Sequence, residues 1–304
     1  MNFLITGAWQ SAKDYINEIE NKGHSVVYMQ YEKDELPCNY SWVEGVICNG
    51  LFLNHPIDKF DNLKYIQLTS AGFDRVPMDY VKEHNIKIFN ARGVYSIPMA
   101  EFAVSGVLQL YKNAKFFIKN QQNKLWEKDR NLIELYGKTV CVVGCGSVGT
   151  ECAKRFKAFG CKIFGVDFVT KQDENYDDIM HLDKLDEILS KSDVIVLTLP
   201  LTKDTYHIID KNRLSKFKDD SVLVNIARGA VVDTEALNSA LLENKLYGAV
   251  LDVFEDEPLS NDNNLWNFEN FILTPHNSFV GDKNFFRLNS TIILNLIRGK
   301  YEEQ

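Results

Sequence analysis

Short apolar runs recur along the whole chain, with amphipathic or polar stretches between them. Apolar runs of this length, bounded by polar turns, are typical of strands that are buried on both faces. Five such strands are expected in the first part of the chain: residues 3–6, 26–29, 45–48, 65–68 and 86–89. Six more are expected later: residues 139–143, 162–167, 194–199, 222–226, 249–254 and 271–274. Because helical stretches alternate with these strands, the pattern predicts an α/β protein with parallel sheets.

Two longer helices are expected in addition. The first begins near Ser96, the expected N-cap, has Pro98 in its first turn, and runs to about Lys112. Proline is tolerated in a first turn because the backbone N–H groups there have no intrahelical partner. This helix is apolar on much of its circumference, so we expect it to be buried. A polar stretch over residues 119–128 follows, and the second long helix spans residues 283–298.

A glycine-rich turn stands between the strand at residues 139–143 and the helical pattern after it. The turn contains Gly144, Gly146 and Gly149, and the next strand ends in Asp167. This order of strand, glycine turn, helix and acid is the dinucleotide-binding fingerprint. Gly144 allows the tight turn, Gly146 lets the backbone approach the pyrophosphate, and Gly149 lets the helix lie close to its strand. The helix N-terminus then offers free N–H groups to the phosphates.

The acid at the end of the second strand indicates which dinucleotide is bound. The Asp167 carboxylate accepts hydrogen bonds from the ribose hydroxyls of NAD and repels the 2′-phosphate of NADP. Lys171 lies four residues later and partly offsets that repulsion. The sequence therefore predicts NAD as the cofactor.

Composition narrows the class of protein. The length of 304 residues suits two domains, and the net charge of −8 argues against nucleic acid or an anionic membrane as a partner. No apolar run approaches the ~20 residues that span a bilayer. Residues 1–7 form an expected strand without a positive flank, so we expect no signal peptide and a cytoplasmic protein. The six cysteines show no metal-ligand spacing and are expected as buried thiols: Cys38, Cys48, Cys141, Cys145, Cys152 and Cys161.

The position of the fingerprint predicts the domain organisation. It lies in the middle of the chain, so an α/β unit must precede it. If the last helix returns to that first unit, the first domain is discontinuous. We expect a first segment of the substrate domain at residues 1–94, a dinucleotide-binding domain at 95–275 and a returning segment at 276–304.

Four ionisable residues follow or end the late strands, where ligands of parallel sheets bind. Arg228 comes just after an apolar strand, and its planar guanidinium suits a bidentate contact with a carboxylate, the alternative being an ion pair with a surface acid. Asp252 lies in an apolar run and needs a hydrogen-bonding partner. Glu257 is one of three consecutive acids, and the residues alone do not separate an active-site role from a solvated one. Of the six histidines, only His276 combines a strand end with such neighbours, as an acid/base requires.

Several long motifs together resemble one family, the D-isomer-specific 2-hydroxyacid dehydrogenases. The resemblance covers nearly the whole chain, and its motifs occur in the family's order. They are Ser70-Ala71-Gly72-Phe73-Asp74, Met99-Ala100-Glu101, Leu135-Tyr136-Gly137-Lys138-Thr139, Leu199-Pro200-Leu201-Thr202, Asn225-Ile226-Ala227-Arg228-Gly229, Asp252-Val253-Phe254-Glu255-Asp256-Glu257-Pro258 and Thr274-Pro275-His276. The resemblance implies two Rossmann-like domains: a discontinuous, flavodoxin-like substrate domain and a doubly wound NAD-binding domain.

The resemblance also implies roles for individual residues. The family's catalytic arginine, glutamate and histidine correspond to Arg228, Glu257 and His276. Its cofactor contacts, beside the three glycines, correspond to Ser147, Val148, Asp167, Leu199, Thr205, Ile226, Ala227, Arg228 and Asp252. The substrate carboxylate is expected to meet the backbone N–H groups of Ala71 and Gly72 as well as Arg228. A homodimer is implied through the helix that begins at Ser96, with the segment around Trp126 crossing to the partner.

The implied function is interconversion of a small 2-oxo acid and its D-2-hydroxy acid with NAD. Residues 49–52 are neutral and partly apolar where phosphoglycerate enzymes carry basic residues, which favours a small or apolar substrate. Formate dehydrogenase is a related alternative, but that enzyme has glutamine at the position of Glu257. Two further alternatives are an NAD-sensing, corepressor-like interaction module and a homologue without catalytic activity.

Overall fold

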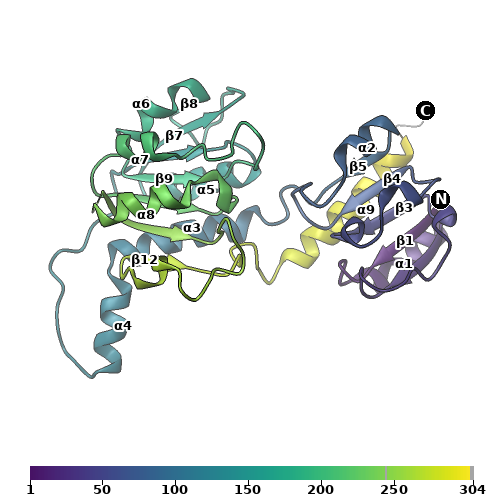
Figure 1. Ribbon diagram of the computed structural model, residues 1–304, viewed down its shortest axis with the longest axis horizontal. Coiled ribbons are helices and arrows are strands. Elements are labelled where there is room, and N and C mark those ends of the chain that lie inside the picture. The colour runs from purple at the N-terminus through teal and green to yellow at the C-terminus, as the bar shows by residue number, and fades with distance from the viewer. Residues whose placement is uncertain (244, 302–304) are drawn as a thin grey trace. The chain divides into compact units, whose positions relative to one another are not determined.

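The structure is a computed structural model that describes residues 1–243 and 245–301. The chain divides into two compact units, Met1–Tyr95 with Gly281–Gln304, and Ser96–Val280 (Figure 1). Residues 302–304, the end of the expected segment 276–304, lie outside the described residues.

The first unit contains a five-stranded parallel sheet with the strand order β2-β1-β3-β4-β5. The strands are β1 (Asn2–Thr6), β2 (Ser25–Met29), β3 (Gly45–Cys48), β4 (Tyr65–Leu68) and β5 (Lys87–Phe89). The helices are α1 (Ala12–Asn21), α2 (Met78–Glu83) and α9 (Asn284–Tyr301). The strand order reverses between β1 and β3, which is the topological switch point of this sheet.

Helices cover both faces of the first sheet. Ile19 of α1 and Ile292 of α9 pack with Phe3 and Ile47 on one face, and Val81 of α2 belongs to the core of the other. Buried hydrogen bonds attach α9 to this unit: Trp9 Nε1 donates to Asn289 Oδ1 at 2.6 Å, and Asn295 Nδ2 donates to Gln67 Oε1 at 2.9 Å. The last helix is therefore part of the first unit.

The second unit contains a seven-stranded parallel sheet with the order β12-β11-β10-β9-β6-β7-β8. The strands are β6 (Thr139–Val143), β7 (Lys162–Asp167), β8 (Asp178–His181), β9 (Val194–Leu197), β10 (Ser221–Asn225), β11 (Leu246–Leu251) and β12 (Phe271–Leu273). The helices are α3 (Ser96–Tyr111), α4 (Ala114–Gln122), α5 (Ser147–Ala158), α6 (Leu185–Leu189), α7 (Lys211–Lys216) and α8 (Thr234–Leu242). Its order reverses between β6 and β9.

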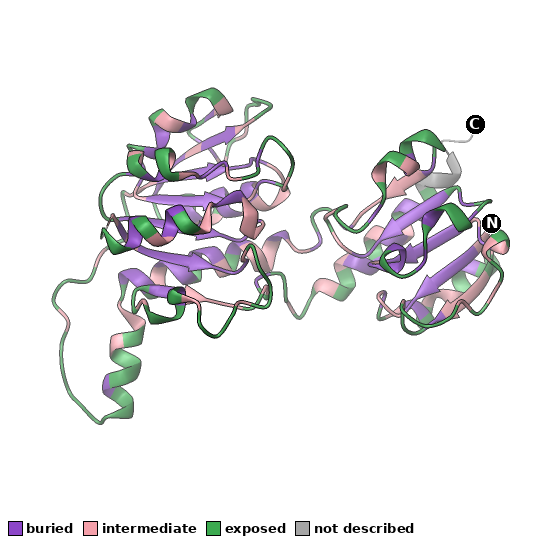
Figure 2. Ribbon diagram, in the orientation of Figure 1, coloured by how far each residue is buried: buried purple, intermediate pink, exposed green. Residues whose placement is uncertain are grey.

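The second sheet is also buried on both faces. Val107 of α3 and Phe156 of α5 pack on one face, while Leu214 of α7 and Leu237 of α8 pack on the other. Figure 2 shows the buried strands inside a layer of helices with exposed outer faces, and α4 exposed along most of its length. The expected α/β fold with two parallel sheets is confirmed.

Four local expectations were wrong. Strand β8 was missed, so the second sheet has seven strands among the described residues and not six. Helix α4 (Ala114–Gln122) was not predicted, and its last residues overlap the polar stretch 119–128. Strand β11 ends at Leu251, so Asp252 follows the strand and does not lie within it. Ser96 is the first residue of α3 and not the residue before it.

Candidate active site

The glycine turn has the backbone that the fingerprint requires. Gly144 has a φ of +100°, which favours glycine, and its N–H donates to Val166 O at 2.8 Å. A Cβ on Gly149 would come within 1.9 Å of Gly144 O, so only glycine lets α5 approach the turn this closely. A Cβ on Gly146 would meet nothing within 4 Å, so the space beside it is open. This open side, at the N-terminus of α5, fits the pyrophosphate of a dinucleotide.

Asp167 ends β7 beside the glycine turn. Its Oδ2 accepts a hydrogen bond from Cys145 N at 2.6 Å, and its Oδ1 accepts one from Val169 N at 3.4 Å. A carboxylate has about four acceptor positions, so capacity remains for ribose hydroxyls. Lys171 Nζ lies 3.8 Å from Asp173 Oδ2, so Lys171 forms an ion pair with an acid other than Asp167.

Arg228 stands on a turn that other side chains brace. Asn225, the last residue of β10, accepts a hydrogen bond from Ala227 N at 3.1 Å and donates one to Arg228 O at 3.0 Å. Arg228 Nη1 donates to Ala227 O at 2.7 Å. A Cβ on Gly229 would come within 1.9 Å of the Phe254 carbonyl carbon, so the loop after β11 packs directly on this turn. The side chain is half-buried and belongs to the carboxyl edge of the sheet.

Asp252 is fully buried, and its carboxylate is engaged by the segment that carries the histidine. Oδ1 accepts from Thr274 Oγ1 and from Asn277 N, both at 2.7 Å, and Oδ2 accepts from Ser278 N at 2.9 Å. The backbone completes the arrangement, because His276 N donates to Asp252 O at 2.8 Å. Burial of this carboxyl group is tolerated because three donors compensate it. Asp252 thus fixes the backbone on both sides of His276.

His276 and Glu257 form the central pair of the site. His276 Nδ1 lies 3.0 Å from Glu257 Oε2, and Glu257 Oε1 accepts from Phe254 N at 3.1 Å. The carboxylate is therefore held at both oxygens, and an acceptor at Nδ1 places a proton on that nitrogen. His276 has a φ of +50°, and its side chain is 42% exposed. Nε2 is then the ring nitrogen on the side away from Glu257.

The same acidic loop makes a second histidine pair. His207 Nε2 lies 2.7 Å from Glu255 Oε1, and Thr234 N donates to the same oxygen at 3.3 Å. Glu255 and Glu257 thus pair with different histidines from one short loop. No pattern in the sequence predicts the pair of His207 and Glu255.

The other expected cofactor residues lie near the same edge of the second sheet. Ser147 and Val148 are the first two residues of α5, and Leu199 follows β9 and is buried. The Thr205 hydroxyl is fully buried and donates to Pro200 O at 2.7 Å. Ile226 and Ala227 follow β10 and are buried.

Residues 104–278 match the family model described as "D-isomer specific 2-hydroxyacid dehydrogenase, NAD binding domain". The matched segment is more than half of the chain. The chain belongs to the D-isomer-specific 2-hydroxyacid dehydrogenase family. The sequence resemblance to this family is confirmed.

Similar proteins agree with this assignment. Glyoxylate reductase from Thermofilum pendens is 39% identical over 226 residues, covering 72% of this chain and 67% of that protein. D-3-phosphoglycerate dehydrogenase from Methanocaldococcus jannaschii is 36% identical over 222 residues, and the match spans only 42% of its length. The solved structure of D-lactate dehydrogenase from Aquifex aeolicus, complexed with NAD and lactic acid, has a TM-score of 0.82. It is 30% identical, and the match covers 99% of this chain and 97% of that chain.

This 2-hydroxyacid dehydrogenase is an NAD-dependent oxidoreductase that interconverts 2-oxo acids and 2-hydroxy acids. The expected cofactor and reaction class are confirmed. The similar proteins are named as reductases and dehydrogenases, so the NAD-sensing interaction module is not favoured.

The dehydrogenase's expected substrate-carboxylate donors, Ala71 and Gly72, lie in the first unit. They follow β4 at the carboxyl edge of that sheet. Asn90 Nδ2 donates to Ala71 O at 2.6 Å and Ser70 Oγ donates to Gly72 O at 3.1 Å, so side chains fix the backbone of this loop.

The cysteine of the glycine turn is not activated as a nucleophile. All six are free, and burial raises the pKa of Cys145, next to Gly144, to about 12. A thiol with such a pKa stays protonated near neutral pH. Within the described residues, no group of three or more His, Cys, Asp or Glu side chains is placed to hold a metal ion. Nor does any helix among them have the length and apolar character to cross a membrane.

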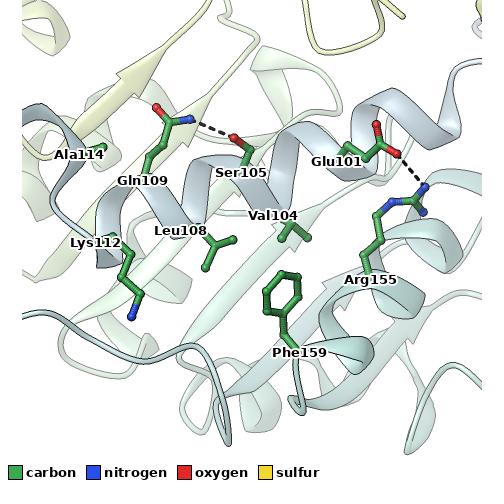
Figure 3. Close-up of a pocket in the computed structure, with 9 residues that line it drawn as sticks. All are labelled: Glu101, Val104, Ser105, Leu108, Gln109, Lys112, Ala114, Arg155 and Phe159. Carbon is green, nitrogen blue, oxygen red and sulfur yellow. Dashed lines mark hydrogen bonds and ion pairs between the residues drawn. The ribbon is translucent and has the colours of Figure 1, made fainter. Parts of the chain in front are cut away.

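A groove on α3 and α5 is distinct from the active-site edge. Figure 3 shows Val104, Leu108 and Phe159 at its apolar centre. Glu101, Ser105, Gln109, Lys112, Ala114 and Arg155 complete the lining. Glu101 and Arg155 form an ion pair of 3.3 Å at one end, and Gln109 Nε2 donates to Ser105 Oγ at 3.1 Å.

Proposed function

We propose that this dehydrogenase reduces a small 2-oxo acid to its D-2-hydroxy acid and catalyses the reverse oxidation, with His276 as the acid/base. The observation that carries the proposal is the His276–Glu257 pair, in which a carboxylate held at both oxygens lies 3.0 Å from Nδ1. A histidine so oriented donates a proton from Nε2 to the oxygen formed at the substrate's C2.

Arg228 binds the substrate carboxylate in this proposal. Its guanidinium forms two parallel hydrogen bonds to the carboxylate and polarises the neighbouring carbonyl. The backbone N–H groups of Ala71 and Gly72 are the further carboxylate donors that the family resemblance implies. A substrate held in one orientation reacts faster, because the entropic cost of aligning it is met on binding.

The protonation state of His276 determines whether the ring gives or takes the proton. In reduction, the imidazolium gives its Nε2 proton to the developing alkoxide, and in oxidation the neutral ring takes the proton from the hydroxyl. Bound NADH supplies the hydride, and NAD accepts it in the reverse direction. The charge of Glu257 stabilises the imidazolium. Asp252 is a positioning residue, since it holds the backbone of residues 274–278 around the histidine.

A screen of NADH oxidation over 2-oxo acids tests this proposal. The panel varies chain length, branching and terminal charge, with glyoxylate, pyruvate and hydroxypyruvate as the small members. We expect turnover with at least one small member and the D-enantiomer as the product. Binding of NADH without turnover of any 2-oxo acid would instead indicate a homologue without catalytic activity.

The cofactor preference gives a quantitative prediction. We expect kcat/KM for NADH to exceed that for NADPH by about ten- to a hundredfold, because the Asp167 carboxylate repels the 2′-phosphate. Steady-state kinetics with both cofactors at one 2-oxo acid concentration measure the ratio. Lys171→Ala is the control, and it should keep or raise the ratio, because Lys171 offsets the repulsion. Equal efficiencies in the unmodified protein would contradict the role of Asp167.

We propose that two copies of this chain associate through the groove on α3 and α5. The apolar centre of Val104, Leu108 and Phe159 has a polar rim, as protein interfaces commonly do. Exposed apolar side chains continue from α4 into the segment after it: Phe117, Ile118, Leu125 and Trp126, with Trp126 97% exposed. A two-fold pairing of this face is the simplest closed assembly, and it agrees with the interface that the family resemblance implies.

Light scattering tests the dimer. At micromolar concentration we expect twice the chain mass of 34.9 kDa. Leu108→Glu should give the monomer mass, because it places a charge at the apolar centre of the groove. Leu242→Glu is the matched control, since Leu242 is 77% exposed on α8, outside the groove. A monomer mass for the unmodified protein would refute the dimer.

We also propose that the protein works in the cytoplasm. Support comes from its six free cysteines, which suit a reducing compartment.

A further inference from the structure

The strand order of the first unit predicts a ligand-binding position in that unit. In open parallel sheets, ligands bind outside the carboxyl ends of the strands at the point where the strand order reverses. In this sheet the reversal lies between β1 and β3, so Thr6, Asn49 and Gly50 flank it: Thr6 ends β1, and the other two follow β3.

A carboxylate of the chain itself occupies this position. Glu32 Oε1 accepts from Thr6 Oγ1 at 2.7 Å and from Asn49 N at 2.6 Å. Glu32 Oε2 accepts from Gly50 N at 2.6 Å. Glu32 follows β2, so a single side chain joins the ends of β1, β2 and β3.

The donors around Glu32 are of the kind that bind anions. Two consecutive backbone N–H groups and a hydroxyl converge on two oxygens, as they do in many phosphate-binding loops. A Cβ on Gly50 would meet Glu32 Oε2 at 3.4 Å and Arg75 Cδ at 3.7 Å, so the stem of an arginine lies beside the same glycine. With Glu32 in place these donors are satisfied, and a negative charge is fixed at the carboxyl edge.

We propose that Glu32 is a specificity-determining residue that excludes 2-oxo acids bearing a second anionic group. It fills the donor set that would hold a phosphate, and its charge repels one. Residues 49–52 carry no charge of their own, so the charge that lies on these backbone donors is that of Glu32. The inference rests on the proposed function in one respect, namely that the first unit receives the substrate's side chain.

Two substrates that differ only in a phosphoryl group test the inference. Hydroxypyruvate and 3-phosphohydroxypyruvate are compared by kcat/KM with NADH in the unmodified protein, Glu32→Gln and Glu32→Ala. We expect the ratio of phosphorylated to unphosphorylated substrate to rise about tenfold or more in both variants, because like-charge repulsion is removed. Glu32→Gln keeps the size and one acceptor oxygen, so it decides the test if Glu32→Ala does not fold.

Asp34→Asn is the matched control. It removes the same charge two residues away, from an exposed side chain outside the Thr6–Glu32–Gly50 cluster. We expect its substrate ratio to stay within about twofold of the original, since an exposed charge is screened. A folded Glu32→Gln protein with an unchanged ratio would overturn the proposal, as would equal losses with both substrates.

A binding measurement separates this inference from the proposed function. Thermal unfolding is followed with increasing inorganic phosphate, which needs no turnover. We expect phosphate to raise the Tm of Glu32→Ala more than that of the unmodified protein or Asp34→Asn. Equal shifts in all three would show that no anion position opens when Glu32 is removed. If no 2-oxo acid is reduced but the shift occurs, the donor set is real and the proposed substrate role fails.

Discussion

Arg228→Lys should lower kcat/KM for 2-oxo acid reduction by about a hundredfold, while the Kd for NADH changes little. Lysine keeps the positive charge but loses the planar pair of donors that matches a carboxylate. The loss of one charge-assisted hydrogen bond is worth about 2–3 kcal/mol, which gives this factor. The effect should be specific to the substrate, because Arg228 stands on a turn that Asn225 and Gly229 hold in place independently of its side chain.

Stopped-flow or steady-state reduction with one 2-oxo acid measures the change, and NADH fluorescence titration measures cofactor binding. Arg213→Lys is the control. Arg213 on α7 forms an ion pair with Asp186, in which Nε lies 3.0 Å from Oδ1, and no contact with substrate is expected for it. An unchanged rate in Arg228→Lys would move the carboxylate anchor elsewhere, and Arg75 is the next candidate. A large loss in the control would show instead that arginine replacement destabilises the unit.

The two sheets were predictable because most of their strands are continuous apolar runs. Strand β8 was missed because it has no such run: Asp178 and His181 are exposed, and only Ile179 is buried. It lies at the edge of the sheet, where one side has no neighbouring strand and the apolar signal is weak. Helix α4 was missed for a related reason. Among its described residues only Asn120 is buried, and its apolar side chains Phe117 and Ile118 are exposed, so α4 contributes no apolar face to a core.

The glycine turn was the most predictable part of the site. Each glycine meets a backbone requirement that follows from the order of strand, glycine turn and helix. The acidic run 255–257 was not predictable from its residues. Glu255 and Glu257 both pair with a histidine, and only the fold shows that Glu257 faces His276 while Glu255 faces His207. The family resemblance selected Glu257, and its catalytic role stays a prediction.

Two roles depend on long-range contacts that no local pattern contains. Asp252 was expected at the cofactor, and in the structure its carboxylate receives three hydrogen bonds from residues 274–278. Its expected contact with the cofactor stays a prediction. Glu32 begins the charged run 32–35, in which no single residue stands out in the sequence. Its donors come from residues 6, 49 and 50, so only the folded sheet brings them together.

Glu257→Gln should change the pH dependence of the reaction and not only its rate. Reduction requires the imidazolium of His276, and a carboxylate 3.0 Å from Nδ1 stabilises that cation. Glutamine keeps an acceptor of nearly the same shape, so the ring should stay oriented, but the charge is lost. The alkaline limb of reduction should therefore move to lower pH. At pH 8 we expect reduction to fall by about tenfold or more, within the range of general acid catalysis.

The reverse reaction supplies an internal check. Oxidation uses the neutral imidazole, so its acidic limb should also move to lower pH, and oxidation near pH 7 should lose less than reduction. The measurement is kcat/KM against pH in both directions for the unmodified protein and the variant. Glu255→Gln is the matched control, because it makes the same change in the same loop beside His207, and its limbs should stay in place. A lower rate in Glu257→Gln with both limbs unmoved would mean that Glu257 only orients the ring, and the charge of the pair would have no part in catalysis.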